Sequence, residues 1–165
     1  MKKILFFIRS LNAGGAERQL VYTAKGLVEL GYDVTVLTFY SGGFYAEELS
    51  CARVRLLSLN KKGRWDLVAF LTHLISTLRT EAPDVVYSFL GGANIFAILA
   101  RPFIPRMRII WGVRSSNMDL NNYGRVACWS YLVECRLARF ADRIIANSHA
   151  GLKYAVAHGF PEAKL

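Results

Sequence analysis

The sequence of 165 residues has no hydrophobic run long enough to cross a membrane as a helix. Its apolar runs, such as residues 4–8, 96–100 and 109–111, are short, whereas a spanning helix needs about 20 apolar residues. The first run follows a basic start and is ended by Arg9 after five residues. Because a signal-peptide core has about 7 to 15 apolar residues, we expect residues 4–8 to form a buried strand instead.

Cysteine is scarce, which argues against disulfide bonds and a structural metal. Cys51, Cys128 and Cys135 are the three cysteines. The last two fall on one predicted helix with Cα atoms about 10 Å apart, too far for a disulfide. The sequence has no CxxC pair or His/Cys cluster, so we expect no metal site. Three reduced, mostly buried thiols indicate a cytoplasmic protein.

Several signatures of nucleotide and nucleic-acid binding are also absent. The sequence has no GxGxxG and no acidic residue after the second predicted strand, which disfavours NAD. It has no GxxxxGK[ST] P-loop. It also has no recognition-helix or RNP-type signature, so we expect no nucleic-acid partner. The net charge of +9 nevertheless attracts phosphates, whether of nucleic acid, a nucleotide-sugar or an anionic membrane. Charge alone does not choose among these.

What is present is an alternation of two kinds of segment. Short β-branched and aromatic runs predict strands at residues 3–8, 33–39, 54–59, 84–89, 108–113 and 143–146. Helical periodicity predicts helices at residues 16–30, 64–81, 92–100, 123–140 and 148–158. Helix 123–140 is apolar on most sides, so we expect it to be deeply packed. The order predicts an α/β fold, a Rossmann-like doubly wound parallel sheet of about six strands with helices on both faces. We expect strand order 3-2-1-4-5-6 and a ligand crevice at the carboxyl ends of the first and fourth strands.

Two glycine pairs stand at that predicted crevice. Gly14 and Gly15 follow the first strand, and Gly91 and Gly92, with Asn94, follow the fourth. Glycines at a helix start let a ligand approach the backbone closely and leave free N–H groups for an anion. A tight turn alone would explain either pair equally well. Their recurrence on both sides of the crevice favours a binding site.

Polar residues follow two further strands. Arg114, Ser115 and Asn117 come after the fifth strand, and a guanidinium with small polar side chains suits a phosphate or sugar hydroxyls. A solvated surface loop is the alternative there. Asn147 and Ser148 end the sixth strand, where capping of the last helix by Ser148 is the favoured interpretation.

A basic cluster precedes the second predicted helix. Lys61, Lys62 and Arg64 lie beside Trp65, although the helix dipole disfavours cations at a helix start. Cations next to a tryptophan suit the interface of an anionic membrane. A solvated loop would account for the cluster as well. We hypothesise peripheral association with the inner face of the cytoplasmic membrane.

Four segments together resemble the N-terminal domain of the group 1 (family 4) glycosyltransferases of the GT-B fold. They are GGAER at residues 14–18, GLVELGYDV at 26–34, DVVYS at 84–88 and ADRIIANS at 141–148. The resemblance spans essentially the whole chain. It implies that residues 1–165 are the acceptor-side lobe of a two-domain enzyme, whose C-terminal donor-binding domain is absent from this chain.

The resemblance also implies an activity and roles for residues. Such enzymes transfer a sugar from a nucleotide-diphosphate-sugar to a glycan or lipid-linked acceptor, with retention of configuration and no required metal or cofactor. Gly14 and Gly15 would lie over the donor, with Glu17 and Arg18 near the acceptor. Many members carry a histidine at about the position of Arg114. This chain has arginine there instead, so no catalytic residue is assigned. The lobe alone should be inactive, and a bacterial surface-polysaccharide pathway is expected. The alternative function is a non-catalytic nucleotide- or phosphate-binding module.

Overall fold

The computed structural model describes residues 1–63, 66–113 and 124–165. Six parallel strands form one sheet in the order β3-β2-β1-β4-β5-β6. The strands are β1 (Lys3–Ile8), β2 (Asp33–Thr38), β3 (Arg55–Ser58), β4 (Val85–Phe89), β5 (Arg108–Val113) and β6 (Arg143–Ala146). The α-helices are α1 (Gly15–Glu29), α2 (Ala46–Cys51), α3 (Leu67–Glu81), α4 (Gly91–Ala100), α5 (Arg125–Leu137) and α6 (His149–Ala157). The predicted fold class and strand order are confirmed.

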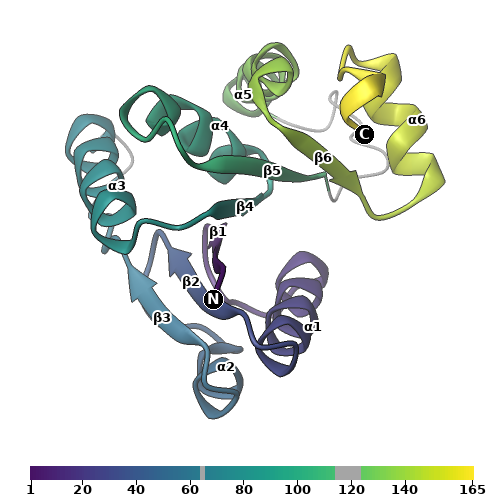
Figure 1. Ribbon diagram of the computed structural model, residues 1–165. Helices are drawn as coiled ribbons and strands as arrows, with labels where there is room; N and C mark the ends of the chain where they lie inside the picture. Colours follow the sequence, from purple (N-terminus) through teal and green to yellow (C-terminus); the bar gives the residue numbers. More distant parts are fainter. Residues whose placement is uncertain (64–65, 114–123) are drawn as a thin grey trace.

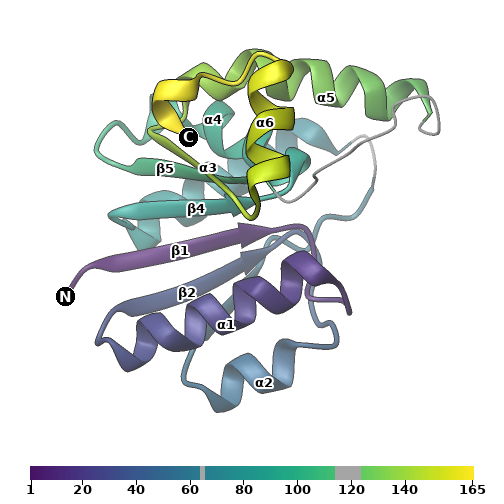
Figure 2. The ribbon, with the colours of Figure 1, turned by 90° about the vertical axis from the view of Figure 1, so that its right-hand side faces the viewer.

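The helices lie in layers on the two faces of the sheet. Figures 1 and 2 show α1 and α2 on one face and α3, α4 and α5 on the other, with α6 beside the β6 edge. Right-handed crossovers produce this division, because the chain first winds outward from β1 to β3 and then from β4 to β6. The direction therefore changes between β1 and β4, which is where the carboxyl ends of a doubly wound sheet admit a ligand.

The core consists of one buried cluster on each face. Along β1, Leu5 and Phe7 belong to one cluster, and Phe6 and Ile8 belong to the other. Alternate residues of a strand point to opposite faces, so a strand covered on both sides is apolar throughout. Residues 4–8 are therefore a continuous apolar run because they form a strand that is buried on both faces, as predicted.

Three predictions about helices and thiols were wrong. The six-residue helix α2 was not predicted, because so short a segment shows little periodicity. Helix α5 is not deeply packed: Trp129 is 68% exposed, and Val126 and Leu132 are also exposed, because α5 covers the outer side of α4 near the sheet edge (Figure 1). The thiols are not mostly buried either, since Cys51 is exposed and the other two are half-buried.

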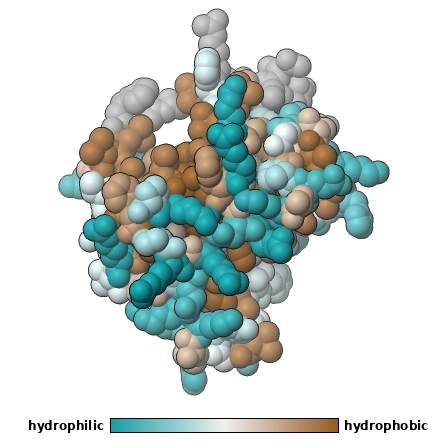
Figure 3. Space-filling view, turned by 45° about the horizontal axis from the view of Figure 1, so that its top comes forward, coloured by the Kyte–Doolittle hydropathy of each residue, from teal (hydrophilic) through white to brown (hydrophobic). Residues whose placement is uncertain are grey.

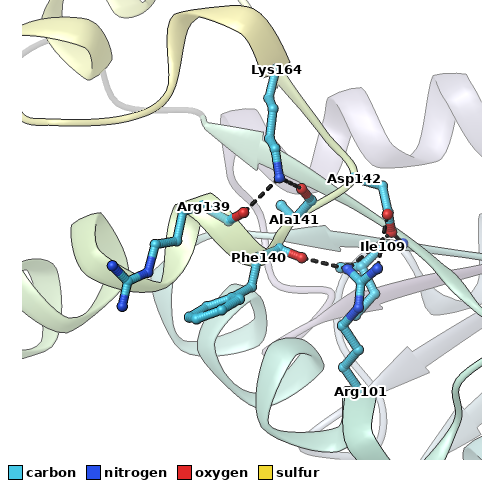
Figure 4. A network of polar contacts seen from close by, with 7 residues as sticks. All are labelled: Arg101, Ile109, Arg139, Phe140, Ala141, Asp142 and Lys164. Carbon is cyan, nitrogen blue, oxygen red and sulfur yellow. Dashed lines mark hydrogen bonds and ion pairs between the residues drawn. The ribbon is translucent and has the colours of Figure 1, made fainter.

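A polar network fixes the start of β6, at the sheet edge opposite the predicted crevice (Figure 4). Arg101 donates to both carboxylate oxygens of Asp142, at 3.1 and 2.9 Å, and to the carbonyl of Phe140. The backbone N–H of Ile109 donates to Asp142 at 2.7 Å. Lys164 donates to the carbonyls of Arg139 and Ala141, at 2.5 and 2.7 Å. The network joins α4, β5 and the chain end to the segment that enters β6.

Asp142 should make stability depend on pH. Burial acts to raise the pKa of its carboxyl, but the hydrogen bonds and the charge of Arg101 outweigh burial and hold it below its ordinary value of 3.8. Its contribution is therefore present above pH 3.8 and is lost as pH falls through the lower, folded-state pKa.

We expect Asp142→Asn to lower the free energy of unfolding by about 1–2 kcal/mol at pH 7, because a third of the side chain is exposed and solvent screens the pair. Urea denaturation of both proteins at pH 7 and pH 3 measures this, and the difference should shrink at pH 3. Glu48→Gln, which breaks the exposed pair with Lys25, is the control and should leave the free energy of unfolding nearly unchanged, because solvent screens an exposed pair. Equal losses in both variants, or a loss independent of pH, would contradict the assignment.

Within the residues that the structure describes, no helix has the length and apolar composition that crossing a bilayer requires.

Candidate functional site

The turn between β1 and α1 presents an uncapped helix start. Gly14 is the N-cap in an extended conformation (φ −166°), and no side chain caps the helix there. The first backbone hydrogen bond runs from the N–H of Arg18 to the carbonyl of Gly14, at 3.0 Å. The N–H groups of residues 15–17 therefore lack partners within the helix. Together with the helix dipole they favour a negatively charged ligand.

Turn geometry does not explain the glycines in the two pairs. None of Gly14, Gly15, Gly91 and Gly92 has a positive φ. A Cβ added to Gly15 would meet nothing within 4 Å, and one added to Gly92 would meet only the ring of Phe39 at 4.0 Å. At these two positions the chain itself has room for a side chain. The free space favours close approach of a ligand over a tight turn as the reason for glycine.

Gly14 is in a different situation. A Cβ there would lie 2.2 Å from the carboxylate of Glu17, so the Glu17 side chain folds back against the start of its own helix. A carboxylate at this place is favoured by the helix dipole. Glu17 therefore competes with any anionic ligand for the N–H groups of this turn, and a ligand would have to displace it.

A cleft opens between α1 and the tip of β6. It has a volume of about 620 Å³ and is lined by Gly15, Ala16, Arg18, Gln19, Tyr22 and Asn147. Asn147 follows β6 and leads into α6, which lies beside the β6 edge of the sheet, whereas α1 covers one face (Figures 1 and 2). The structure thus brings Gly15, Arg18 and Asn147, three predicted site residues, to one place. The guanidinium of Arg18 and the amide of Asn147 can bind phosphate oxygens or sugar hydroxyls.

Tyr22 and Gln19 line the cleft but were not predicted. Both are on α1, one helical turn after Arg18 and Gly15 respectively, so they share a helix face with them. That spacing was the signal that could have found them. Tyr22 is 67% exposed, and an exposed aromatic ring beside a polar cleft is suited to stacking on a sugar or a base.

The second turn, between β4 and α4, is closed from within the protein. Asn94 is fully buried, accepts a hydrogen bond from Ser88 at 2.7 Å and donates one to Glu134 at 2.7 Å. A Cβ at Gly91 would lie 2.6 Å from the other carboxylate oxygen of Glu134. Gly91 and Asn94 therefore support the turn and do not face the cleft, whereas Gly92 is exposed. Glu134 was not predicted, because its partners are remote in sequence.

Burial shifts the pKa of Glu134. Removal from water raises the pKa of its carboxyl above the ordinary value, and the hydrogen bond from Asn94 opposes this only in part. The residue as a whole is 9% exposed. It is the one buried acidic side chain in the part of the chain that the structure describes.

The remaining predicted residues divide into two groups. Ser148 caps α6, since its hydroxyl accepts from the N–H of Gly151 at 3.0 Å, which confirms the capping interpretation. The ammonium of Lys61 lies over the ring of Phe70, 5.3 Å from its centre, while Lys62 is exposed. Arg64, Trp65, Arg114, Ser115 and Asn117 lie outside the described residues.

With this geometry established, comparison with known proteins decides the family. The sequence model of the protein family Glycosyltransferase Family 4 matches residues 13–165. The chain belongs to this family. This confirms the resemblance seen in the sequence, and it is consistent with an α/β lobe whose cleft lies at the carboxyl ends of the strands.

Two curated relatives are similar over part of their length. One is the Campylobacter jejuni GalNAc-alpha-(1->4)-GalNAc-alpha-(1->3)-diNAcBac-PP-undecaprenol alpha-1,4-N-acetyl-D-galactosaminyltransferase, 36% identical over 107 residues, which are 61% of this chain and 29% of that protein. The other is an uncharacterized glycosyltransferase of Haemophilus influenzae, 29% identical over 136 residues, 76% of this chain and 36% of that protein. The family 4 chain thus spans about a third of the length of these relatives.

The fold recurs in solved structures. Anabaena HepE in complex with UDP-glucose superposes with a TM-score of 0.80 at 23% identity, over 99% of this chain and 42% of that one. A glycosyltransferase from Rickettsia africae gives 0.73 at 17% identity, over 99% and 41%. At such identities the likeness shows the fold, which is that of one GT-B half. The family 4 chain is therefore an N-terminal GT-B domain.

Proposed function

We propose that this chain is the acceptor-side lobe of a glycosyltransferase that moves a sugar from a nucleotide-diphosphate-sugar to a glycan or lipid-linked acceptor with retention of configuration. The observation that carries the proposal is the cleft at Gly15, where glycine has no role in the turn and the helix start is free of a cap hydrogen bond. A backbone open to this extent suits a ligand that touches it.

The cleft supplies what transfer from a diphosphate needs from this side. As the bond between sugar and diphosphate breaks, negative charge grows on the leaving phosphate. Once the Glu17 carboxylate is displaced, the N–H groups at the start of α1 and the Arg18 guanidinium can stabilise that charge without a metal. HepE was solved with UDP-glucose bound, and the Campylobacter relative is named for a substrate linked to undecaprenol diphosphate. The first supports a nucleotide-sugar donor here, and the second supports a lipid-linked acceptor.

The same geometry is the reason to expect that the lobe does not work alone. Among the described residues, those that line the cleft belong to α1 and the tip of β6, so a donor bound there would remain in contact with water. A second domain would supply most donor contacts and exclude water from the reacting bond. We propose that residues 1–165 alone do not turn over, and that the donor domain completes the site in the whole protein.

A transfer assay tests the function. The complete gene product is incubated with labelled UDP- and GDP-sugars and with undecaprenyl-diphosphate-linked glycans, and the anomeric configuration of the product is read by NMR. We expect label to enter the glycan with its configuration retained, and none to enter with residues 1–165 alone. Tight nucleotide binding without transfer to any acceptor would instead support the non-catalytic binding module.

A second surface is suited to a membrane that carries the acceptor. A groove of about 760 Å³ runs between α3 and α4, and exposed apolar side chains border it: Leu67, Val68, Leu99 and Phe103. Figure 3 shows apolar atoms interspersed with polar ones on this side of the molecule. Arg79 lines the groove, and Lys62 is exposed just before α3. Apolar side chains next to cations suit an anionic bilayer interface, so we propose peripheral association through this surface.

Vesicle sedimentation checks the membrane proposal. We expect the protein to sediment with vesicles of anionic phospholipid at low salt and to be released at high salt, because screening weakens the attraction. Lys62→Ser should weaken binding about fivefold, since each cation near such a surface contributes about 1 kcal/mol. Lys153→Ser, an exposed cation on α6, is the matched control and should bind like the parent. Equal binding to neutral vesicles would contradict the proposal.

A further inference from the structure

The residue that joins β4 to α4 has a backbone conformation that is costly for its type. Leu90 has φ 71° and ψ 155°, close to a region that glycine alone occupies readily. A leucine persists there only where surrounding contacts hold it. The strain lies next to Gly91, at the carboxyl end of β4, on the sheet edge that also carries the β1–α1 turn.

A chain of buried hydrogen bonds reaches this turn from α5. The hydroxyl of Ser88 donates to Asn94, and the amide of Asn94 donates to Glu134, each at 2.7 Å. Ser88 and Asn94 are fully buried, and Glu134 is 9% exposed. Buried polar groups with their partners in place fix one arrangement, because any other leaves a group unsatisfied. We call these three residues the Glu134 network.

The second oxygen of Glu134 lies against the first residue of α4. It would be 2.6 Å from a Cβ at Gly91, so it occupies the space of a side chain there. Helix α4 has no side-chain cap of its own, and its first N–H groups lack partners within the helix. A carboxylate at this end is favoured by the helix dipole, which sets the position of α4 relative to α5.

We propose that Glu134 is a positioning residue that holds the Leu90–Gly91 turn in its strained conformation and thereby fixes the end of the neighbouring strand β1, which leads to the cleft. Glu134 is on α5 and is not among the described residues that line the cleft, so it acts through the turn. The effect on sugar transfer rests on the proposed function; the effect on the turn does not. Strand β4 passes the position of the turn on to its neighbour β1, because Ser88 is paired in register with Phe7 near the carboxyl end of β1.

Paired substitutions in the complete gene product test the contact directly. Gly91→Ala and Glu134→Ala should each lower kcat by about 10- to 100-fold, because a displacement of about 1 Å that is passed on to the cleft is enough for such a loss, even from a remote mutation. The double variant should be no worse than Glu134→Ala, since removal of the carboxylate makes room for the methyl group at residue 91. Losses that multiply in the double variant would overturn the proposal.

Two further variants separate positioning from stability. Glu134→Gln keeps an acceptor for Asn94 but places an NH₂ group toward the N–H groups of α4, so kcat should still fall while the KM for the donor changes little. Asp142→Asn, at the opposite sheet edge, is the control: it should lower Tm without lowering kcat. A kcat in the Glu134 variants that equals the parent value would overturn the positioning role.

Amide hydrogen exchange measures the stability of the β4–α4 turn and needs no substrate. The amides of Leu90 and Asn94, which donate to the carbonyls of Gly112 and Leu90, should exchange at least tenfold faster in Glu134→Ala, while those near the end of α4 stay as in the parent protein. Unchanged exchange at these two amides would overturn the proposal whatever the activity. If the parent protein transfers no sugar but the exchange effect is present, then the proposed function has failed and the Glu134 contact stands.

Discussion

We expect Gly15→Ala to lower the rate of sugar transfer about 100-fold without loss of stability. A Cβ at residue 15 meets nothing within 4 Å in the free protein, and alanine in a helix is more favourable than glycine by about 0.5–1 kcal/mol. The same methyl group would point into the cleft, where a bound donor would have to move away from the backbone N–H groups. Steady-state transfer assays and thermal unfolding of the complete gene product measure both effects.

Gly26→Ala is the matched control for this prediction. Gly26 lies on the same helix, away from the cleft lining, and an added Cβ there also meets nothing within 4 Å. It should raise the free energy of unfolding by about 0.5–1 kcal/mol and leave transfer unchanged. If Gly15→Ala transfers sugar as fast as Gly26→Ala, then the glycine at residue 15 does not serve ligand approach.

A single added methyl group should cause a large loss of stability at Gly43. This residue has φ +121°, and a Cβ there would lie 2.7 Å from the carbonyl carbon of Leu11 and 2.8 Å from its oxygen. The neighbour is backbone and cannot rotate away. Leu11 is 2% exposed, and its carbonyl accepts a hydrogen bond from the N–H of Tyr45. We expect Gly43→Ala to lower the free energy of unfolding by about 3 kcal/mol, from backbone strain and steric overlap together.

The same substitution at the adjacent Gly42 distinguishes the cost of backbone strain from the cost of steric overlap. Gly42 has φ +74°, but an added Cβ has open space around it, so Gly42→Ala should cost only about 1–2 kcal/mol for the left-handed conformation. Urea denaturation of both variants measures the difference. Because Leu11 lies in the segment that leads from β1 to Gly14, Gly43→Ala should also weaken substrate binding. Equal losses at the two positions would mean that Leu11 moves freely, contrary to its burial.

Much of the fold could be predicted from local sequence patterns. Strands covered on both faces are continuous apolar runs, as β1 is, and the crossover rule then leaves few possible strand orders. The end of the first predicted helix is also close to that of α1, where Gly31 adopts φ +82°, the left-handed conformation in which a glycine ends a helix. The exposure of one side of α5 could not be predicted, because its apolar side chains were expected to be buried against other elements. An apolar composition does not by itself show which neighbours a helix has.

The site was predictable in part, for a similar reason. The glycine pairs marked the two turns, but the sequence alone could not say what each glycine accommodates. At Gly15 the space is open to the cleft, whereas at Gly91 it is taken by the carboxylate of Glu134. The second case depends on how α5 packs against α4, which no local pattern encodes. Asn94 was assigned to the cleft for the same reason and is instead buried within the Glu134 network.

A crystal structure of the complete gene product with a nucleotide-sugar and an acceptor analogue tests the central claim most directly. We predict substrate atoms in van der Waals contact with Gly15, at about 4 Å, an anionic oxygen on the guanidinium of Arg18, and Asn147 on the opposite wall of the cleft. Substrate bound away from α1, with this cleft filled by protein side chains in the complex, would contradict the account.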